Sequence, residues 1–111
     1  MPWLPLFGSR PALRVPLVIY SRADCPLCDA MRAVVEDHLP ERQYELRVVD
    51  VDSDRDLKKR FGLRVPVLEI GGVVLFEGRC EPRELRRAFK KRARYWPAEI
   101  LHARAEKKPA S

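Results

Sequence analysis

Two cysteines stand three positions apart, at Cys25 and Cys28, in the stretch YSRADCPLC. A pair with this spacing has three interpretations: a redox-active dithiol, half of a metal site, or two small buried side chains. A four-ligand metal site would need two more ligands from one further cysteine and two histidines, and the sequence has no second Cys-x-x-Cys. The dithiol is therefore favoured. A metal-handling or iron–sulfur-cluster module using Cys25 remains the alternative.

The cysteines fall where a strand is expected to end and a helix to begin. Residues 16–21, PLVIYS, form a short apolar run typical of a strand buried on both faces. Apolar residues then recur at helical spacing from Leu27 to Val35. Pro26 suits the first helical position, and Pro40 marks the end of the helix. Cys25 is thus expected at or beside the N-cap, and Cys28 in the first turn.

This placement suits thiol chemistry, because the nucleophile in thiol–disulfide exchange is the thiolate. Unpaired N–H groups and the partial positive charge of a helix N-terminus stabilise that anion. Arg22 would add a full positive charge, whereas Asp24 and Asp29 oppose it. The N-terminal cysteine of such a turn is the more exposed one. We therefore expect Cys25 to attack a substrate disulfide and Cys28 to resolve the mixed disulfide.

The rest of the chain continues the alternation of strands and helices. Residues 44–52 read as a second strand, and a short helix follows, with Ser53 and Asp56 as a variant capping box and Gly62 as its end. Gly71-Gly72 joins two apolar runs as a β-hairpin. Pro82 opens a last helix that Pro97 interrupts, after which residues 99–105 form a short helix or fray.

A strand–helix–strand unit requires two parallel strands with a right-handed crossover, and the hairpin is antiparallel within itself. The expected fold is therefore α/β, a four-stranded mixed sheet flanked by helices on both faces. We expect an irregular N-terminal arm over residues 1–15, a thioredoxin-like domain over 16–92 and a basic extension over 93–111.

The net charge of +6 is unevenly distributed. Residues 1–78 carry 11 Lys/Arg and 12 Asp/Glu, whereas residues 79–111 carry 11 and 4. We expect a solvated helix face and tail here, in preference to a surface for nucleic acid or for an acidic partner protein. No apolar stretch is long enough to span a membrane. Prolines interrupt the N-terminus, which is a poor export signal, so a reducing cytoplasmic location is expected.

Three motifs give the chain a resemblance to the glutaredoxin-like branch of the thioredoxin superfamily: YSRADCPLC, FGLRVPVLEIGG and FEGRCE. In glutaredoxins a lysine lies three residues before Cys-Pro-Tyr-Cys. Here Arg22 holds that place and Leu27 replaces the tyrosine. The resemblance implies that Pro66 is cis and packs against the cysteines, and that the backbone of Val65 binds the substrate.

The same resemblance implies a binding surface made by Arg22, Pro26, Leu27, Val65 and Pro66. It extends to Gly78 and Glu81, which occupy the region that holds the γ-glutamyl end of glutathione in glutaredoxins. No organic cofactor is implied, and no metal. Glutathione or a reductase would supply electrons, and the substrate would be a disulfide-containing protein or a glutathione mixed disulfide. The protein is expected to be a monomer. Cys80 is either an extra thiol near the site or an idle buried cysteine.

Overall fold

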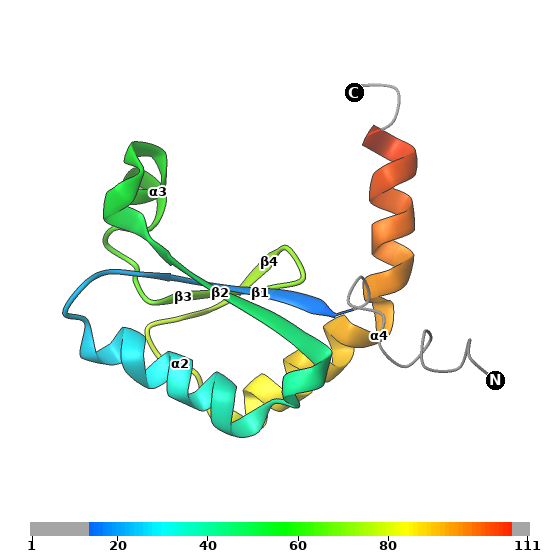
Figure 1. The fold of residues 1–111 in the computed structure, drawn as a ribbon, viewed down its shortest axis with the longest axis horizontal. Helices are drawn as coiled ribbons and strands as arrows, with labels where there is room; N and C mark the ends of the chain where they lie inside the picture. Colours follow the sequence, from blue (N-terminus) through cyan, green and yellow to red (C-terminus); the bar gives the residue numbers. More distant parts are fainter. Residues whose placement is uncertain (1–13, 108–111) are drawn as a thin grey trace.

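A mixed sheet with helices on both sides forms the body of the protein (Figure 1). The computed structural model describes residues 14–107. The elements in chain order are β1 (Val15–Ser21), α2 (Pro26–His38), the 3₁₀ turn η2 (Glu41–Gln43), β2 (Tyr44–Asp50), the 3₁₀ turn η3 (Val51–Ser53), α3 (Arg55–Phe61), β3 (Val67–Ile70), β4 (Val73–Glu77) and α4 (Pro82–Lys107).

The sheet has four strands in the order β2-β1-β3-β4. β1 runs parallel to β2, with Leu17 opposite Leu46, and antiparallel to β3, with Leu17 opposite Ile70. β3 and β4 form an antiparallel hairpin with a register shift after Leu68. The predicted four-stranded mixed sheet is thus confirmed. The crossover through α2 places the carboxyl end of β1 at the start of α2, where the cysteines lie.

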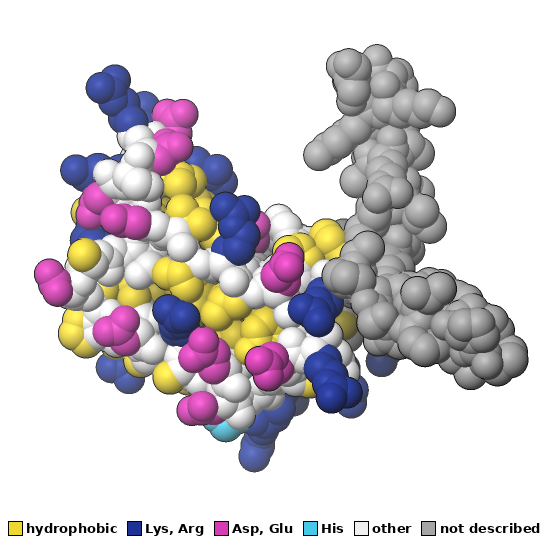
Figure 2. All heavy atoms as spheres, in the orientation of Figure 1, with side chains coloured by type: hydrophobic (Ala, Val, Ile, Leu, Met, Phe, Trp, Pro, Cys, Tyr) yellow, Lys and Arg dark blue, Asp and Glu magenta, His cyan; other side chains and the backbone are white. Residues whose placement is uncertain are grey.

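The main core lies on the sheet face that α2 and the first part of α4 cover (Figure 1). Leu17 and Ile19 of β1 are fully buried there, against Met31 of α2 and Leu85 of α4. Burying such side chains contributes about 1.5–3 kcal/mol each. The edge strand β2 is less covered, since Val48 is 44% exposed and hydrophobic atoms show in the middle of that side of the molecule (Figure 2).

The opposite sheet face is covered only at one end. Phe61 of α3 packs there with Val51 and Val67, and its ring stacks on Tyr20 at a centroid distance of 4.3 Å. Because α3 has seven residues, Val18 remains only partly buried. The prediction that β1 is buried on both faces is therefore wrong for the half of the strand that lies beyond α3.

The ends of α3 also differ from the sequence-based prediction. Its N-cap is Asp54, whose Oδ1 accepts the N–H groups of Asp56 at 2.8 Å and Leu57 at 3.2 Å. Ser53 instead closes η3, where its hydroxyl donates to the Asp50 carbonyl at 2.6 Å. A carboxylate accepts two N–H groups at once, which explains why the cap lies one residue later than expected. Gly62 ends the helix in the right-handed region, at φ −55°.

The sequence predicts that Pro97 interrupts the last helix, and this prediction is wrong. α4 continues through it to Lys107 and changes direction along its length (Figure 1). A proline removes one helical hydrogen bond and displaces a carbonyl, which bends a helix without necessarily ending it. No separate helix over residues 99–105 forms, and α4 crosses the expected boundary between residues 92 and 93. The predicted arm over residues 1–15 lies, up to residue 13, outside the described residues.

The hairpin turn requires two glycines. Gly71 and Gly72 have φ angles of 57° and 84°, the left-handed region in which a Cβ is disfavoured. Gly71 also faces α4, because a Cβ built on it would lie 3.2 Å from Nη2 of Arg92, whereas nothing lies within 4 Å of one built on Gly72. Arg92 Nη2 donates to the Gly71 carbonyl at 2.7 Å.

The two glycines allow a matched test. Gly72→Ala should lower the free energy of unfolding by about 1 kcal/mol, the ordinary cost of a left-handed alanine. Gly71→Ala should cost more, about 2 kcal/mol, because the Arg92 side chain must also move. Urea unfolding followed by circular dichroism measures both. An equal cost for the two variants would contradict this account of the α4 contact.

Candidate active site

The N-terminus of α2 is built around the sulfur of Cys25. Cys25 is the N-cap residue, with φ −118° and ψ 99°, and its Sγ accepts the N–H of Cys28 at 3.2 Å. Its carbonyl accepts the N–H of Asp29 at 3.1 Å, which closes the first turn. Pro26 follows at the first helical position, where a backbone N–H would have no partner within the helix, so its absence costs no hydrogen bond. A sulfur thus sits where the helix offers free N–H groups and positive potential.

The two sulfurs are joined as a disulfide, with the Cα atoms 5.2 Å apart. The two cysteines differ in exposure. Cys25 is partly exposed, whereas Cys28 is 3% exposed and turned into the protein. Of the two residues, the N-terminal cysteine is therefore the more exposed one.

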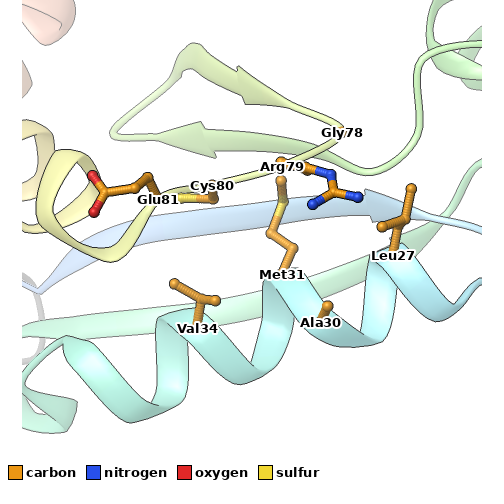
Figure 3. A pocket seen from close by; sticks show the side chains of 8 residues that line it. All are labelled: Leu27, Ala30, Met31, Val34, Gly78, Arg79, Cys80 and Glu81. Carbon is orange, nitrogen blue, oxygen red and sulfur yellow. The ribbon is translucent and has the colours of Figure 1, made fainter.

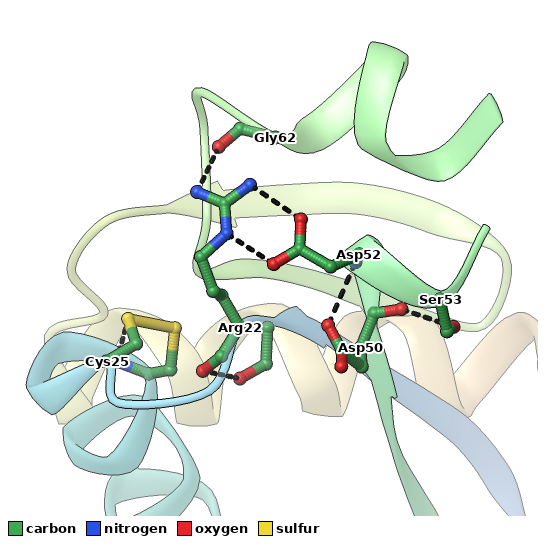
Figure 4. A network of polar contacts seen from close by, with 8 residues as sticks. Arg22, Cys25, Asp50, Asp52, Ser53 and Gly62 are labelled. Carbon is green, nitrogen blue, oxygen red and sulfur yellow. Dashed lines mark hydrogen bonds and ion pairs between the residues drawn. A yellow bond between two sulfur atoms is a disulfide. The ribbon is translucent and has the colours of Figure 1, made fainter. Parts of the chain in front are cut away.

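Arg22 is held by η3 and by the end of α3 (Figure 4). Its Nε and Nη2 donate to the two carboxylate oxygens of Asp52 at 2.9 and 3.2 Å, and its Nη1 donates to the Gly62 carbonyl at 2.9 Å. These hydrogen bonds raise the pKa of Arg22 and lower the pKa of Asp52. The charge expected beside Cys25 is therefore largely balanced by Asp52, and the side chain ties the loop before α2 to the neighbouring elements.

Val65 and Pro66 lead into β3. Their peptide bond is cis, the form that the family resemblance implies. Pro66 is buried and Val65 is partly exposed. The Pro66 carbonyl accepts the N–H of Gly78 at 2.8 Å, and Gly78 adopts a φ of 76°. Among the hydrogen bonds of residues 14–107, none uses the backbone of Val65. Its N–H and C=O therefore have no hydrogen-bond partner within the described residues.

A cavity of about 330 Å³ opens beside the dithiol motif, between α2 and the loop that joins β4 to α4 (Figure 3). Its wall on α2 is apolar and follows the helical repeat, with Leu27, Ala30, Met31 and Val34. The loop side consists of residues 78–81. Leu27, between the two cysteines, is 45% exposed. The cavity therefore offers an apolar surface next to the disulfide.

The loop side of the cavity brings together Gly78 and Glu81, to which the family resemblance gives a binding role, with Arg79, which sequence reasoning missed. Glu81 already has partners within the chain. Its carboxylate accepts the N–H groups of Arg83 at 3.2 Å and Glu84 at 3.1 Å, so it caps the first turn of α4. Arg79 is exposed at the same cavity and is its positive group.

Cys80 lines this cavity but is buried. Burial raises the pKa of its thiol to about 11, and the carboxylates of Glu84 and Glu81 add to the shift. At neutral pH the thiol is therefore protonated and a poor nucleophile.

Sequence reasoning also missed Asp52, Gly62 and Met31. The helical spacing of Leu27, Met31 and Val34 could have indicated one wall of the cavity. Asp52 and Gly62 lie 30 and 40 positions from Arg22, and nothing local marks those pairings.

Within residues 14–107, no group of three or more His, Cys, Asp or Glu side chains is placed to hold a metal ion. Within the same residues, no helix has the length and apolar character needed to cross a membrane.

The fold and the site together define a thioredoxin-like protein with a cysteine pair at the N-terminus of its first described helix. The family model described as Glutaredoxin-like domain (DUF836) matches residues 16–97, which is more than half of the chain. The protein belongs to this glutaredoxin-like family. The resemblance seen in the sequence is thereby confirmed.

Solved structures agree on the fold. The chain is similar to Northeast Structural Genomics target protein XcR50 from X. campestris, at 29% identity. Its X-ray structure gives a TM-score of 0.59 over 68% of this chain and 96% of that one. Its solution structure gives 0.57 over 68% and 92%. Mitochondrial thioredoxin 3 from Saccharomyces cerevisiae, in its oxidized form, is 16% identical, with a TM-score of 0.50 over 79% and 89%, and shows the fold alone. No curated protein matches the chain.

The buried thiol can be tested in a protein that lacks the other two cysteines. In the double variant Cys25→Ser/Cys28→Ser, Cys80 is the one remaining thiol. Its thiolate fraction at pH 7.5 should be about a hundredfold below that of an ordinary cysteine, because its pKa lies near 11 instead of 9.0. The alkylation rate with iodoacetamide should rise about tenfold per pH unit up to that value. A rate equal to that of N-acetylcysteine would show that Cys80 is open and reactive.

The pairing of Arg22 with Asp52 predicts a change in the reactivity of Cys25. Asp52→Asn removes a negative charge and leaves that of Arg22 unbalanced, so the Cys25 thiolate should be favoured. In the reduced protein, alkylation of Cys25 at pH 6 should be about twofold faster than in the wild type, the size of effect expected from one nearby charge that solvent screens. Glu36→Gln, which breaks the exposed Arg32–Glu36 pair of α2, is the matched control. An equal acceleration in both variants, or none in Asp52→Asn, would contradict the prediction.

Proposed function

We propose that the protein is a thiol–disulfide oxidoreductase in which Cys25 is the nucleophile and Cys28 the resolving thiol. One observation carries the proposal: the partly exposed Cys25 caps α2 with its sulfur, which is bonded to the sulfur of the buried Cys28 in the first turn of the same helix. Membership of the glutaredoxin-like family supports it. The helix N-terminus stabilises the thiolate on which the first step depends.

The reaction proceeds in two exchanges. The Cys25 thiolate attacks one sulfur of a substrate R–S–S–R′, whose S–S bond breaks. R′–S⁻ leaves with the electron pair and takes up a proton, and Cys25 is left in a mixed disulfide with R. Cys28 loses its proton to water and attacks the Cys25 sulfur, which releases R–S⁻ and forms the intramolecular disulfide. Two electrons pass from the dithiol to the substrate. R–S⁻, like R′–S⁻, takes up its proton from water, into which Cys25 and Cys28 have released theirs.

The surface around the disulfide supports a substrate of protein or glutathione type. The free N–H and C=O of Val65 suit an extended segment bound as an additional strand, next to Pro66. Leu27 and Pro26 border the sulfur, and the cavity at Gly78 and Glu81 would receive the part of the substrate beyond it. Arg79 is placed to meet a carboxylate there. Arg22 acts through Asp52 and Gly62 and positions the loop.

The oxidised protein must be reduced again by a thiol donor. We propose glutathione or a dithiol of a reductase partner as this donor, and no organic cofactor held by the protein. The reduced dithiol is the active form, so the proposal includes a reducing compartment such as the cytoplasm.

Three single variants test the proposal. Cys25→Ser should lose disulfide reductase activity, by about a hundredfold or more, in an insulin reduction assay with dithiothreitol and in the reduction of a glutathionylated peptide with glutathione. Cys28→Ser should accumulate a mixed disulfide on Cys25 that mass spectrometry detects. Cys80→Ser is the control and should keep its activity. Undiminished turnover in Cys25→Ser would overturn the proposal.

A further inference from the structure

A second hollow lies at the other end of α2, away from the disulfide. It has a volume of about 590 Å³ and lies between the end of α2, the turn η2 and α4. Its lining comprises His38, Leu39, Pro40, Gln43, Arg83, Arg86, Arg87, Phe89, Lys90 and Ala93. Four of these carry a positive charge and none is acidic. We refer to this hollow as the basic groove.

The charges of the basic groove form one stripe on α4. Arg83, Arg86, Arg87 and Lys90 are spaced three, four and seven positions from the first, so they share a face of the helix. All four are exposed. Within residues 14–107 none of them is in a salt bridge, whereas Arg22, Arg32 and Arg64 are. Arg86 Nη1 lies 3.0 Å from Nδ1 of His38, which is not an anion. The stripe therefore has no internal counter-charge.

The floor of the basic groove is apolar. Leu39 and Phe89 are buried beneath it, at 6% and 3% exposure, and Pro40 and Ala93 complete the apolar part. An ordinary solvated basic face is convex and needs no hollow under its charges. Here the cations border a concave site that exceeds the cavity beside the disulfide in volume. Lys and Arg side chains project from the molecule below α2 and α4 (Figure 2).

The basic groove is separate from the dithiol. His38 ends α2 and Cys25 caps its start, so the length of the helix, about 20 Å at 1.5 Å per residue, lies between them. A molecule in the groove therefore does not touch the disulfide, and the groove is not part of the substrate site described above.

We propose that the basic groove binds an acidic, amphipathic segment of a partner protein. Its carboxylates would pair with the stripe on α4, and its apolar side chains would enter the hollow between Leu39 and Phe89. Nucleic acid fits less well, because the lining offers no exposed aromatic ring for a base and a phosphate backbone makes no use of an apolar floor. Residues 1–13 of the chain contain no Asp or Glu, so charge does not favour that segment as the occupant.

The test uses the full chain and a short fluorescein-labelled peptide in which glutamates flank a Leu-Phe pair. Fluorescence anisotropy should show binding that weakens as salt rises from about 50 to about 200 mM. Arg86→Glu/Arg87→Glu should weaken the affinity about tenfold or more, since two exposed charges are reversed. Lys58→Glu/Lys59→Glu on α3 changes the net charge equally and should leave the affinity within about twofold. A peptide with serines in place of the Leu-Phe pair should bind at least about fivefold more weakly.

Three results would overturn the proposal: no binding of the acidic peptide, equal loss in both charge-reversed proteins, or tighter binding of a double-stranded DNA oligonucleotide through the same two arginines. The reductase assay keeps this test apart from the proposed function. Arg86→Glu/Arg87→Glu should reduce a small disulfide at the wild-type rate. Loss of peptide binding would therefore not contradict the proposed reductase activity, and loss of reductase activity would not contradict peptide binding by the groove.

Discussion

The Cys25 sulfur accepts the N–H of Cys28 at 3.2 Å, in the place where an oxygen of Ser, Thr or Asp usually caps a helix. Two demands meet at this atom. The helix needs an acceptor for its free N–H groups, and thiol exchange needs an anionic sulfur. When the disulfide is reduced, both demands favour the thiolate. In the proposed function the start of α2 is therefore also the reactive centre, and the contacts that hold this helix in place would also position the reactive sulfur.

Two groups of contacts fix it. Behind the helix, Met31 and Val35 are buried against β1, so α2 cannot turn or slide without breaking the main core. In front, Arg22 spans from the loop to Asp52 and to the Gly62 carbonyl. Because an arginine guanidinium makes two parallel hydrogen bonds to a carboxylate, this ion pair fixes the orientation of the Arg22 side chain as well as its distance from Asp52. The loop is thus held by charge on one side and by packing on the other.

Local signals in the sequence were enough to predict the strands, the hairpin at Gly71-Gly72 and the position of the cysteines at a strand-to-helix junction. They worked because each depends on neighbouring residues: helical spacing, glycines at positive φ, a proline at the first helical position. One failure was local: Asp54, next to the predicted cap Ser53, caps α3 instead. The other failures involve distant parts of the chain, since the length of α3 decides how much of β1 it covers and Asp52 pairs with Arg22 across 30 positions. A single sequence gives no signal for such pairings.

The basic groove and the dithiol lie at opposite ends of α2. The cavity beside the disulfide is lined by α2 and the loop before α4, whereas the groove is lined by the end of α2, by η2 and by residues 83–93 of α4. Both helices pack on one buried sheet face, so the distance between the two sites is set by the core. A partner anchored in the groove would then be held at a fixed reach from Cys25, not over it. Such anchoring would raise the local concentration, at Cys25, of a disulfide that lies about 20 Å from the acidic segment on the partner's surface. If the groove binds such a segment, the two sites together would select partners by the distance between an acidic segment and a disulfide, which neither site alone could do.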